Sequence, residues 1–405
     1  MIADRAGALQ RWWYRDQPTV SDGLSGRANS LGLLRLILAA AVIFSHAFPT
    51  GGLGTDPFTG WFRNQENLGG VAVIGFFAAS GYLIAKSGAR SDVIAFLWHR
   101  VLRIFPAFWL ALLVGAFFVG PIAWFSMGRG VRSYFTVANP WSYVSGNWLL
   151  TIHQYGIADI FVSTPYGQVA GSVLNGSIWT LIYEFFCYLV IAALVLLTVM
   201  RRPRVAKILI IALLAVTAVL RLGFVFTGQN WGVYVPLMSD VSTQILLYAF
   251  LCGSLLAVFS RQIRLDDRAA IIAAVVVIAT LRIEGFQFFG IPAMAYVLFW
   301  LAARLPPMFQ RVGAVNDYSY GVYVYGFLIE QSFASIGLYR LGYVPFVLTS
   351  LVVTGGCAWV SWHLVEKRAL ALKDRGPGRG LVYWYDTARR RPVRGLATTP
   401  AKGQL

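Results

Sequence analysis

Long apolar runs separated by short polar connections make up most of this chain. A run crosses a hydrocarbon core of about 30 Å when it supplies about 20 apolar residues as a helix. Runs of this kind lie near residues 31–49, 69–86, 101–120, 177–199, 207–226, 241–259, 268–283, 289–304, 318–337 and 344–364. The pattern predicts an all-α fold, a polytopic membrane bundle of about ten transmembrane helices. Little more than Glu284 and Gly285 separates the seventh and eighth runs, which predicts a tight pair or a broken helix.

The composition excludes a soluble protein. Hydrophobic residues make up 58% of the 405 residues and charged residues only 13%, which leaves too little polar surface to cover a soluble fold of this length. The three cysteines, Cys187, Cys252 and Cys357, lie in predicted spans without metal-ligand spacing. We therefore expect neither a disulfide nor a zinc site.

The basic residues orient the predicted spans. Lys and Arg concentrate in alternate connections when the amino terminus is placed inside, whereas the outer segments hold only Arg63, Arg129, Arg132, Arg282 and Arg340. The positive-inside rule then puts both termini in the cytoplasm. Topology and anionic membrane lipid thus account for the net charge of +17, and nucleic-acid binding is not needed to explain it.

Three parts follow from this map. Residues 1–30 are expected to form a cytoplasmic segment at the membrane interface, since Trp12, Trp13 and Tyr14 are flanked by arginines. Residues 31–366 form the transmembrane domain. Residues 367–405 are rich in Gly, Pro and Arg and are expected to be a basic, disordered cytoplasmic tail.

Two ionisable residues interrupt the first apolar run. Arg35 and His46 are eleven positions apart, which returns a helix to within roughly 20° of the same face and spans roughly 16 Å. Ionisable groups inside a membrane are costly, so the pair is a functional hypothesis. The alternative is that Arg35 reaches the headgroups at one interface while His46 lies at the other.

Two further candidate groups lie on opposite sides of the membrane. Arg100 and Arg103 are one helical turn apart on the cytoplasmic side and form a fork suited to phosphate, unless they are only positive-inside charge. Glu184 lies about two turns inside the outer boundary and can share a depth with His46. A carboxylate beside an imidazole suits a general base, although Glu184 can equally make a structural hydrogen bond between helices.

The sequence motifs of this chain and their order resemble those of the membrane acyltransferase 3 family over nearly the whole chain. They are Arg35 and His46, FF-x-x-SGYLI (Phe76, Phe77, Ser80, Gly81), Arg100-x-x-Arg103 with Pro106, Trp179 and Glu184, an FLCG turn ending at Gly253, DYSYGVYVYGF around Ser319 and Tyr320, and VEK at Val365–Lys367.

The resemblance implies an integral membrane O-acyltransferase of the bacterial inner membrane. Such an enzyme moves an acyl group, commonly acetyl, from cytoplasmic acyl-CoA to a glycan or lipid-linked glycan, with no permanently bound cofactor. By resemblance, His46 is the essential histidine and Arg35 its partner arginine. Arg100 and Arg103 then belong to the acyl-CoA donor, and Ser80 and Trp179 are expected at the substrate site.

This chain also departs from the family pattern. Ile74 stands where many members have an acid, Gly326 where many have a histidine, and Arg368-Ala369 where a proline is frequent. Many relatives carry a fused hydrolase-like domain that has no counterpart in this sequence.

These groups predict a mechanism. Arg100 and Arg103 would hold the CoA phosphates while the pantetheine arm passes Arg35 toward His46. His46 would then act as a general base on an acceptor hydroxyl, with Glu184 beside it, or carry the acyl group itself. The rival readings are a transporter or flippase, and a non-catalytic subunit of polysaccharide export.

Overall fold

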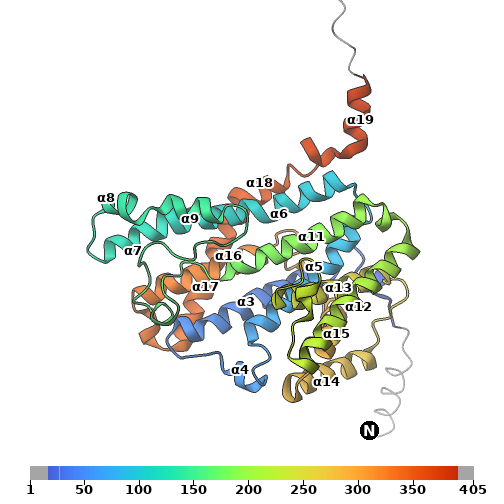
Figure 1. The fold of residues 1–405 in the computed structure, drawn as a ribbon, viewed down its shortest axis with the longest axis horizontal. Helices are drawn as coiled ribbons and strands as arrows, with labels where there is room; N and C mark the ends of the chain where they lie inside the picture. Colours follow the sequence, from blue (N-terminus) through green and yellow to red (C-terminus); the bar gives the residue numbers. More distant parts are fainter. Residues whose placement is uncertain (1–16, 27, 391–405) are drawn as a thin grey trace, which may run out of the picture.

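The computed structural model describes residues 17–26 and 28–390, and it is a bundle of helices (Figure 1). The principal helices are α3 (Leu31–Thr50), α5 (Leu68–Gly88), α6 (Val93–Val114), α11 (Leu181–Leu196), α12 (Pro203–Thr227), α13 (Val241–Val258), α14 (Asp267–Ile283), α15 (Ile291–Arg304), α16 (Ser319–Ser335) and α17 (Tyr343–Ser361). The predicted all-α membrane bundle is confirmed.

All ten predicted ranges are helical. Eight helical segments of the described chain are long and apolar enough to cross a membrane. The other two predicted spans are α14 and α16, which have 17 residues each. α16 lies inside the bundle, where it packs against α3 and α17. The seventh and eighth runs form a tight pair, since α14 and α15 pack together across a short connection in which Glu284 has a φ of 81°.

Polar caps mark where several spans begin. The side chains of Asn67, Asp92, Asp240 and Asp266 accept hydrogen bonds from the first backbone N–H groups of α5, α6, α13 and α14. Such caps satisfy donors that have no partner within the helix. They place the helix starts at the polar edges of the apolar runs.

α5 and α13 approach each other so closely that only glycine fits at their crossing. A Cβ on Gly81 would lie 1.8 Å from the carbonyl oxygen of Phe250, and a Cβ on Gly253 would lie 1.8 Å from that of Ala78. Small residues at such crossings let helix backbones pack directly in a membrane. The prediction of a turn at the FLCG sequence is wrong, because Gly253 lies inside α13 for this packing reason.

We expect Gly253→Ala to destabilise the bundle. The new methyl group meets backbone atoms that cannot rotate away, so α5 and α13 must separate, at a cost of about 1–3 kcal/mol or more. The control is Gly355→Ala in α17, where an added Cβ meets nothing within 4 Å. Melting temperatures in detergent should fall for Gly253→Ala alone, and equal melting of the two variants would contradict the prediction.

Short elements complete the fold. Residues 120–176 form α7 (Gly120–Ser126), α8 (Val131–Ser133), the π-helix η2 (Tyr134–Ala138), α9 (Pro140–Asn147) and α10 (Gly167–Ala170). α9 lies along α6 (Figure 1). The Trp148 ring stacks on that of Trp109 at a centroid distance of 4.6 Å.

The start of the tail, which we expected to be disordered, is helical in the structure. α18 (Lys367–Leu370) and α19 (Gly380–Arg390) are joined by a short 3-10 turn. The tail packs on the beginning of α6, where the indole of Trp98 donates to the carbonyl of Leu372 at 3.0 Å. Asp92 at the same helix end accepts from the backbone of Leu381. Residues 391–405 lie outside the described residues, as does most of the expected interfacial segment at 1–16.

Candidate active site

Three cavities follow one another through the bundle beside α3 and α5. We name them after the orientation that the basic residues predict. The outer cavity is lined by His46, Glu66, Asn67, Val73, Ile74, Trp179, Ser242, Tyr323 and neighbours. The middle cavity is lined by Arg35, Val73, Phe76, Phe77, Ser80, Arg103, Ile104, Thr180, Glu184, Tyr320 and Tyr323. The inner cavity is lined by Arg35, Ser80, Leu83, Ile84, His99, Arg100, Arg103, Tyr188, Leu370 and Lys373. Neighbouring cavities share lining residues, so they form one series.

The inner cavity holds both arginines of the predicted phosphate fork. It has a volume of about 290 Å³. The Arg100 guanidinium lies 5.7 Å from the ring centroids of Phe96 and Tyr188, and it has no ion-pair partner among the described residues. An arginine held between rings without a carboxylate is free to bind an anion.

A single carboxylate joins the other two arginines. Asp317 Oδ2 accepts from Arg35 Nη1 and from Arg103 Nη2, each at 2.5 Å. Asp317 Oδ1 also accepts from the Ser319 hydroxyl at 2.5 Å, and Glu366 lies 4.0 Å from Arg103. α3 and α6 are thus tied to the start of α16. Sequence reasoning missed Asp317, although it is the acid that opens the DYSYG run.

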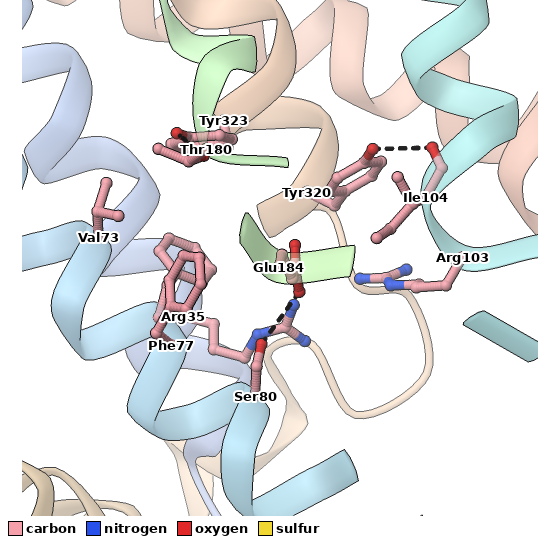
Figure 2. A pocket seen from close by; sticks show the side chains of 11 residues that line it. Arg35, Val73, Phe77, Ser80, Arg103, Ile104, Thr180, Glu184, Tyr320 and Tyr323 are labelled. Atoms are coloured by element: carbon pink, nitrogen blue, oxygen red, sulfur yellow. Dashed lines mark hydrogen bonds between the residues drawn. The ribbon is translucent and has the colours of Figure 1, made fainter. Parts of the chain in front are cut away.

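Glu184 lies in the middle cavity. Its Oε1 accepts from Ser80 Oγ at 3.2 Å and from the Tyr188 hydroxyl at 2.5 Å. Figure 2 shows Ser80, Glu184, Arg35 and Arg103 around the same space. The volume of this cavity is only about 30 Å³, which leaves room for one or two waters. It is the smallest of the three cavities.

The expected contact between Glu184 and His46 does not form in the structure. Glu184 lines the middle cavity and His46 the outer one. Glu184 lies in the first turn of α11, and its carboxylate accepts hydrogen bonds from Ser80 and Tyr188.

His46 lies in the outer cavity, whose volume is about 230 Å³. Its ring meets Phe327 edge-on at a centroid distance of 5.2 Å, and its Nδ1 is buried without a hydrogen-bond partner among the described residues. Trp179, which is 37% exposed, lines the same cavity. Ile74 supplies an apolar wall where relatives are expected to have an acid. His153 is exposed and lines none of these three cavities.

Glu66 is a carboxylate that lines the outer cavity, and no sequence motif pointed to it. It precedes α5, and its Oε1 accepts from Gln287 Nε2 at 3.1 Å. Gln287 in turn accepts from Arg221, which is 1% exposed. Burial raises the pKa of Glu66 from 4.5 to about 7, although Gln287 and the charge of Arg221 oppose the rise.

The pKa of Glu66 predicts a pH dependence of stability. Because its folded pKa lies above its unfolded value, the contribution of the protonated form is complete below pH 4.5 and is lost as the pH rises through about 7. We expect wild-type melting temperature to fall over this range and Glu66→Gln to remove that part of the fall. An unchanged profile in Glu66→Gln would contradict the prediction.

The glycine at position 326 has a packing reason. A Cβ there would lie 2.8 Å from a side-chain carbon of Ile43, so α16 and α3 cross too closely for the histidine of many relatives.

Comparisons with known proteins confirm the family resemblance. A family model described as an acyltransferase domain matches residues 29–363. An O-acetyl transferase of Shigella phage Sf6 is 29% identical over 357 residues, covering 85% of this chain and 96% of that protein. Nodulation protein 10 of Rhizobium leguminosarum bv. viciae is 30% identical over 382 residues, covering 86% of this chain and 95% of that protein. No solved structure matches significantly.

Proposed function

Because the chain belongs to the acyltransferase 3 family, we propose that this O-acetyltransferase uses cytoplasmic acyl-CoA and acylates a hydroxyl of a cell-envelope or exported glycan. The observation that carries the proposal is the series of cavities from the Arg100 fork to His46. The bacterial inner membrane fits the eight apolar helices and the rhizobial relative.

The inner cavity suits the phosphates of the donor. Arg100 has no carboxylate partner, whereas the charge of Arg103 is shared with Asp317. Arg100 is therefore the guanidinium that binds the donor phosphates most directly, and Arg103 holds the wall of the site.

Arg100→Gln should raise the KM for acetyl-CoA roughly tenfold or more, since a hydrogen bond to a charged group contributes about 1.5–3 kcal/mol. The maximal rate and the melting temperature should change little, because no ion pair is broken. Arg311→Gln, an exposed arginine outside the three cavities, serves as the control. Initial rates over a range of acetyl-CoA concentrations measure the effect, and an unchanged KM would remove Arg100 from the donor site.

The middle cavity has to widen when the donor binds. The helix between Arg35 and His46 spans roughly 16 Å, a length comparable with an extended pantetheine arm. The present cavity of about 30 Å³ is too narrow for that arm. Phe76 and Phe77 line it, and a change of their rotamers opens the passage without moving a helix.

The reaction balances at His46. The imidazole takes the proton of the acceptor hydroxyl, the hydroxyl oxygen attacks the thioester carbon, and the C–S bond breaks. The proton then passes to the CoA thiolate, which leaves as a thiol. In the alternative route the imidazole nitrogen attacks first, and an acyl-histidine then reacts with the hydroxyl. Glu184 lines the middle cavity and not the cavity of His46, so we assign it to the passage of the donor.

The outer cavity suits a sugar. Trp179 offers a flat aromatic face, and Glu66, Asn67 and Ser242 offer oxygens and an amide. Pockets that fix a small polar ligand combine an apolar wall with a few placed polar groups. A hydroxyl bound here lies in the same cavity as the imidazole of His46.

Purified protein in vesicles tests the proposal. Radiolabelled acetyl-CoA is supplied on the side that carries the Arg100 fork, and envelope glycan is supplied on the other side. The proposal predicts a covalently labelled glycan and free CoA in equal amounts. Movement of glycan or acetate across the bilayer without an ester would indicate a transporter, and no product in any orientation would refute an enzyme of this kind.

A further inference from the structure

A second basic cavity lies on the side of the bundle where α5 and α13 end and α12 begins. It has a volume of about 420 Å³ and carries four cations, Lys86, Arg90, Lys207 and Arg261. We call it the basic groove. It shares no lining residue with the inner cavity, so it is separate from the proposed donor site.

The cations of the basic groove are not neutralised. No carboxylate lines the groove, and none of its four cations is ion-paired among the residues that the structure describes. Two of them are held in place by aromatic neighbours. The Lys207 ammonium lies 4.6 Å from the ring centroid of Phe259, and Lys86 Nζ donates to the Tyr82 hydroxyl at 3.4 Å.

The α12 end adds to the positive field. α12 begins at Pro203, a residue of the groove, and has no side-chain cap. The uncapped amino end of a long helix favours an anion nearby. The carboxyl ends of α5 and α13 also lie at the groove, and a helix carboxyl end favours a nearby cation. This preference explains one basic side chain at each end, but not four that share a cavity.

We propose that the basic groove binds the phosphate headgroup of an anionic phospholipid. Phosphate is the anion that several cations hold well, and basic pockets between helices on the cytoplasmic side of a membrane bind such headgroups. The other lining residues include Ala85, Ala89, Ala206 and Ala257, which give the groove an apolar wall for the first carbons of the lipid. A soluble phosphate compound would leave that wall exposed to water. The proposal depends on the predicted inside orientation of this face and not on the acyl-transfer reaction.

The test uses the full chain in nanodiscs of phosphatidylcholine with increasing phosphatidylglycerol. Retained lipid is counted by native mass spectrometry. Wild type should retain phosphatidylglycerol, and Lys86→Gln with Lys207→Gln should weaken that retention roughly thirtyfold. Arg261→Gln, at an exposed residue, is the milder variant if the double variant does not fold, and it should weaken retention roughly fivefold.

Two controls make the result decisive. Arg311→Gln with Arg368→Gln removes two exposed cations outside the groove and should leave retention unchanged. Inorganic pyrophosphate added to pure phosphatidylcholine discs can bind at the donor site, so it should bind and stabilise wild type and the Lys86→Gln with Lys207→Gln variant equally. Equal retention of phosphatidylglycerol by the groove and control variants would overturn the proposal, and so would pyrophosphate binding that the groove variant loses with no effect of phosphatidylglycerol.

Discussion

His46→Ala should reduce glycan acylation by roughly 100- to 10,000-fold, the range that a positioned base contributes. The imidazole lines the outer cavity, where it can take the proton of an acceptor hydroxyl. The substitution leaves an unfilled space beside Phe327 but breaks no hydrogen bond of His46 Nδ1, which has no partner among the described residues. The measurement is the ester content of envelope glycan by mass spectrometry.

The matched control for this prediction is His153→Ala. His153 is exposed, and its backbone N–H, which the substitution keeps, donates to Asn147 Oδ1 at 3.0 Å. Acylation should therefore stay normal. Protein level and membrane location are compared in both strains. Full acylation in His46→Ala at a normal protein level would remove His46 from the chemistry, and with it the proposed mechanism.

The helices were predictable because each apolar run is a local signal. Arg35 and His46 lie on one continuous helix, α3, so their separation followed from helix geometry alone. The helix starts at Asn67 and Asp92 are also local, since the capping side chain is near the backbone that it bonds. The two 17-residue helices show the limit, because length alone does not distinguish a span from a helix buried inside the bundle.

The site was predictable only where the residues that form it share a helix. Arg100 and Arg103 are one turn apart, and both line the inner cavity. Asp317 bonds Arg35 across 282 positions of sequence, and no local pattern announces such a contact. Glu66 enters the outer cavity from a loop. Glu184 and His46 line different cavities, because the positions of α3 and α11 relative to each other are a property of the packed bundle.

Asp317 lies at the junction between the inner and middle cavities of the proposed donor path, where it binds Arg35 and Arg103. Arg35 lines both the middle and the inner cavity, and so does Arg103. The shared carboxylate fixes the distance between these two guanidinium groups, and thereby the width of the junction between the cavities. In the proposed mechanism, donor binding and helix packing therefore both depend on the side chains of Asp317, Arg35 and Arg103.

Asp317→Asn should destabilise the protein by about 3 kcal/mol, because removing one partner of a buried ion pair leaves uncompensated charge. Two guanidinium groups, whose side chains are 14% and 16% exposed, would then repel each other. The asparagine keeps the size of the side chain, so the loss reports the charge. The melting temperature in detergent should fall, and the KM for acetyl-CoA should rise because Arg35 and Arg103 move apart.

Asp159→Asn is the matched control, since Asp159 pairs with Arg129 where the side chains are 46% and 37% exposed, and an exposed pair contributes at most about 1 kcal/mol. Arg35→Gln added to Asp317→Asn should cost less than the sum of the single changes, because it removes the guanidinium that is left without a carboxylate, whereas Arg103 keeps Glu366 at 4.0 Å. Additive losses, or equal losses in Asp317→Asn and Asp159→Asn, would show that the shared carboxylate does not hold the junction.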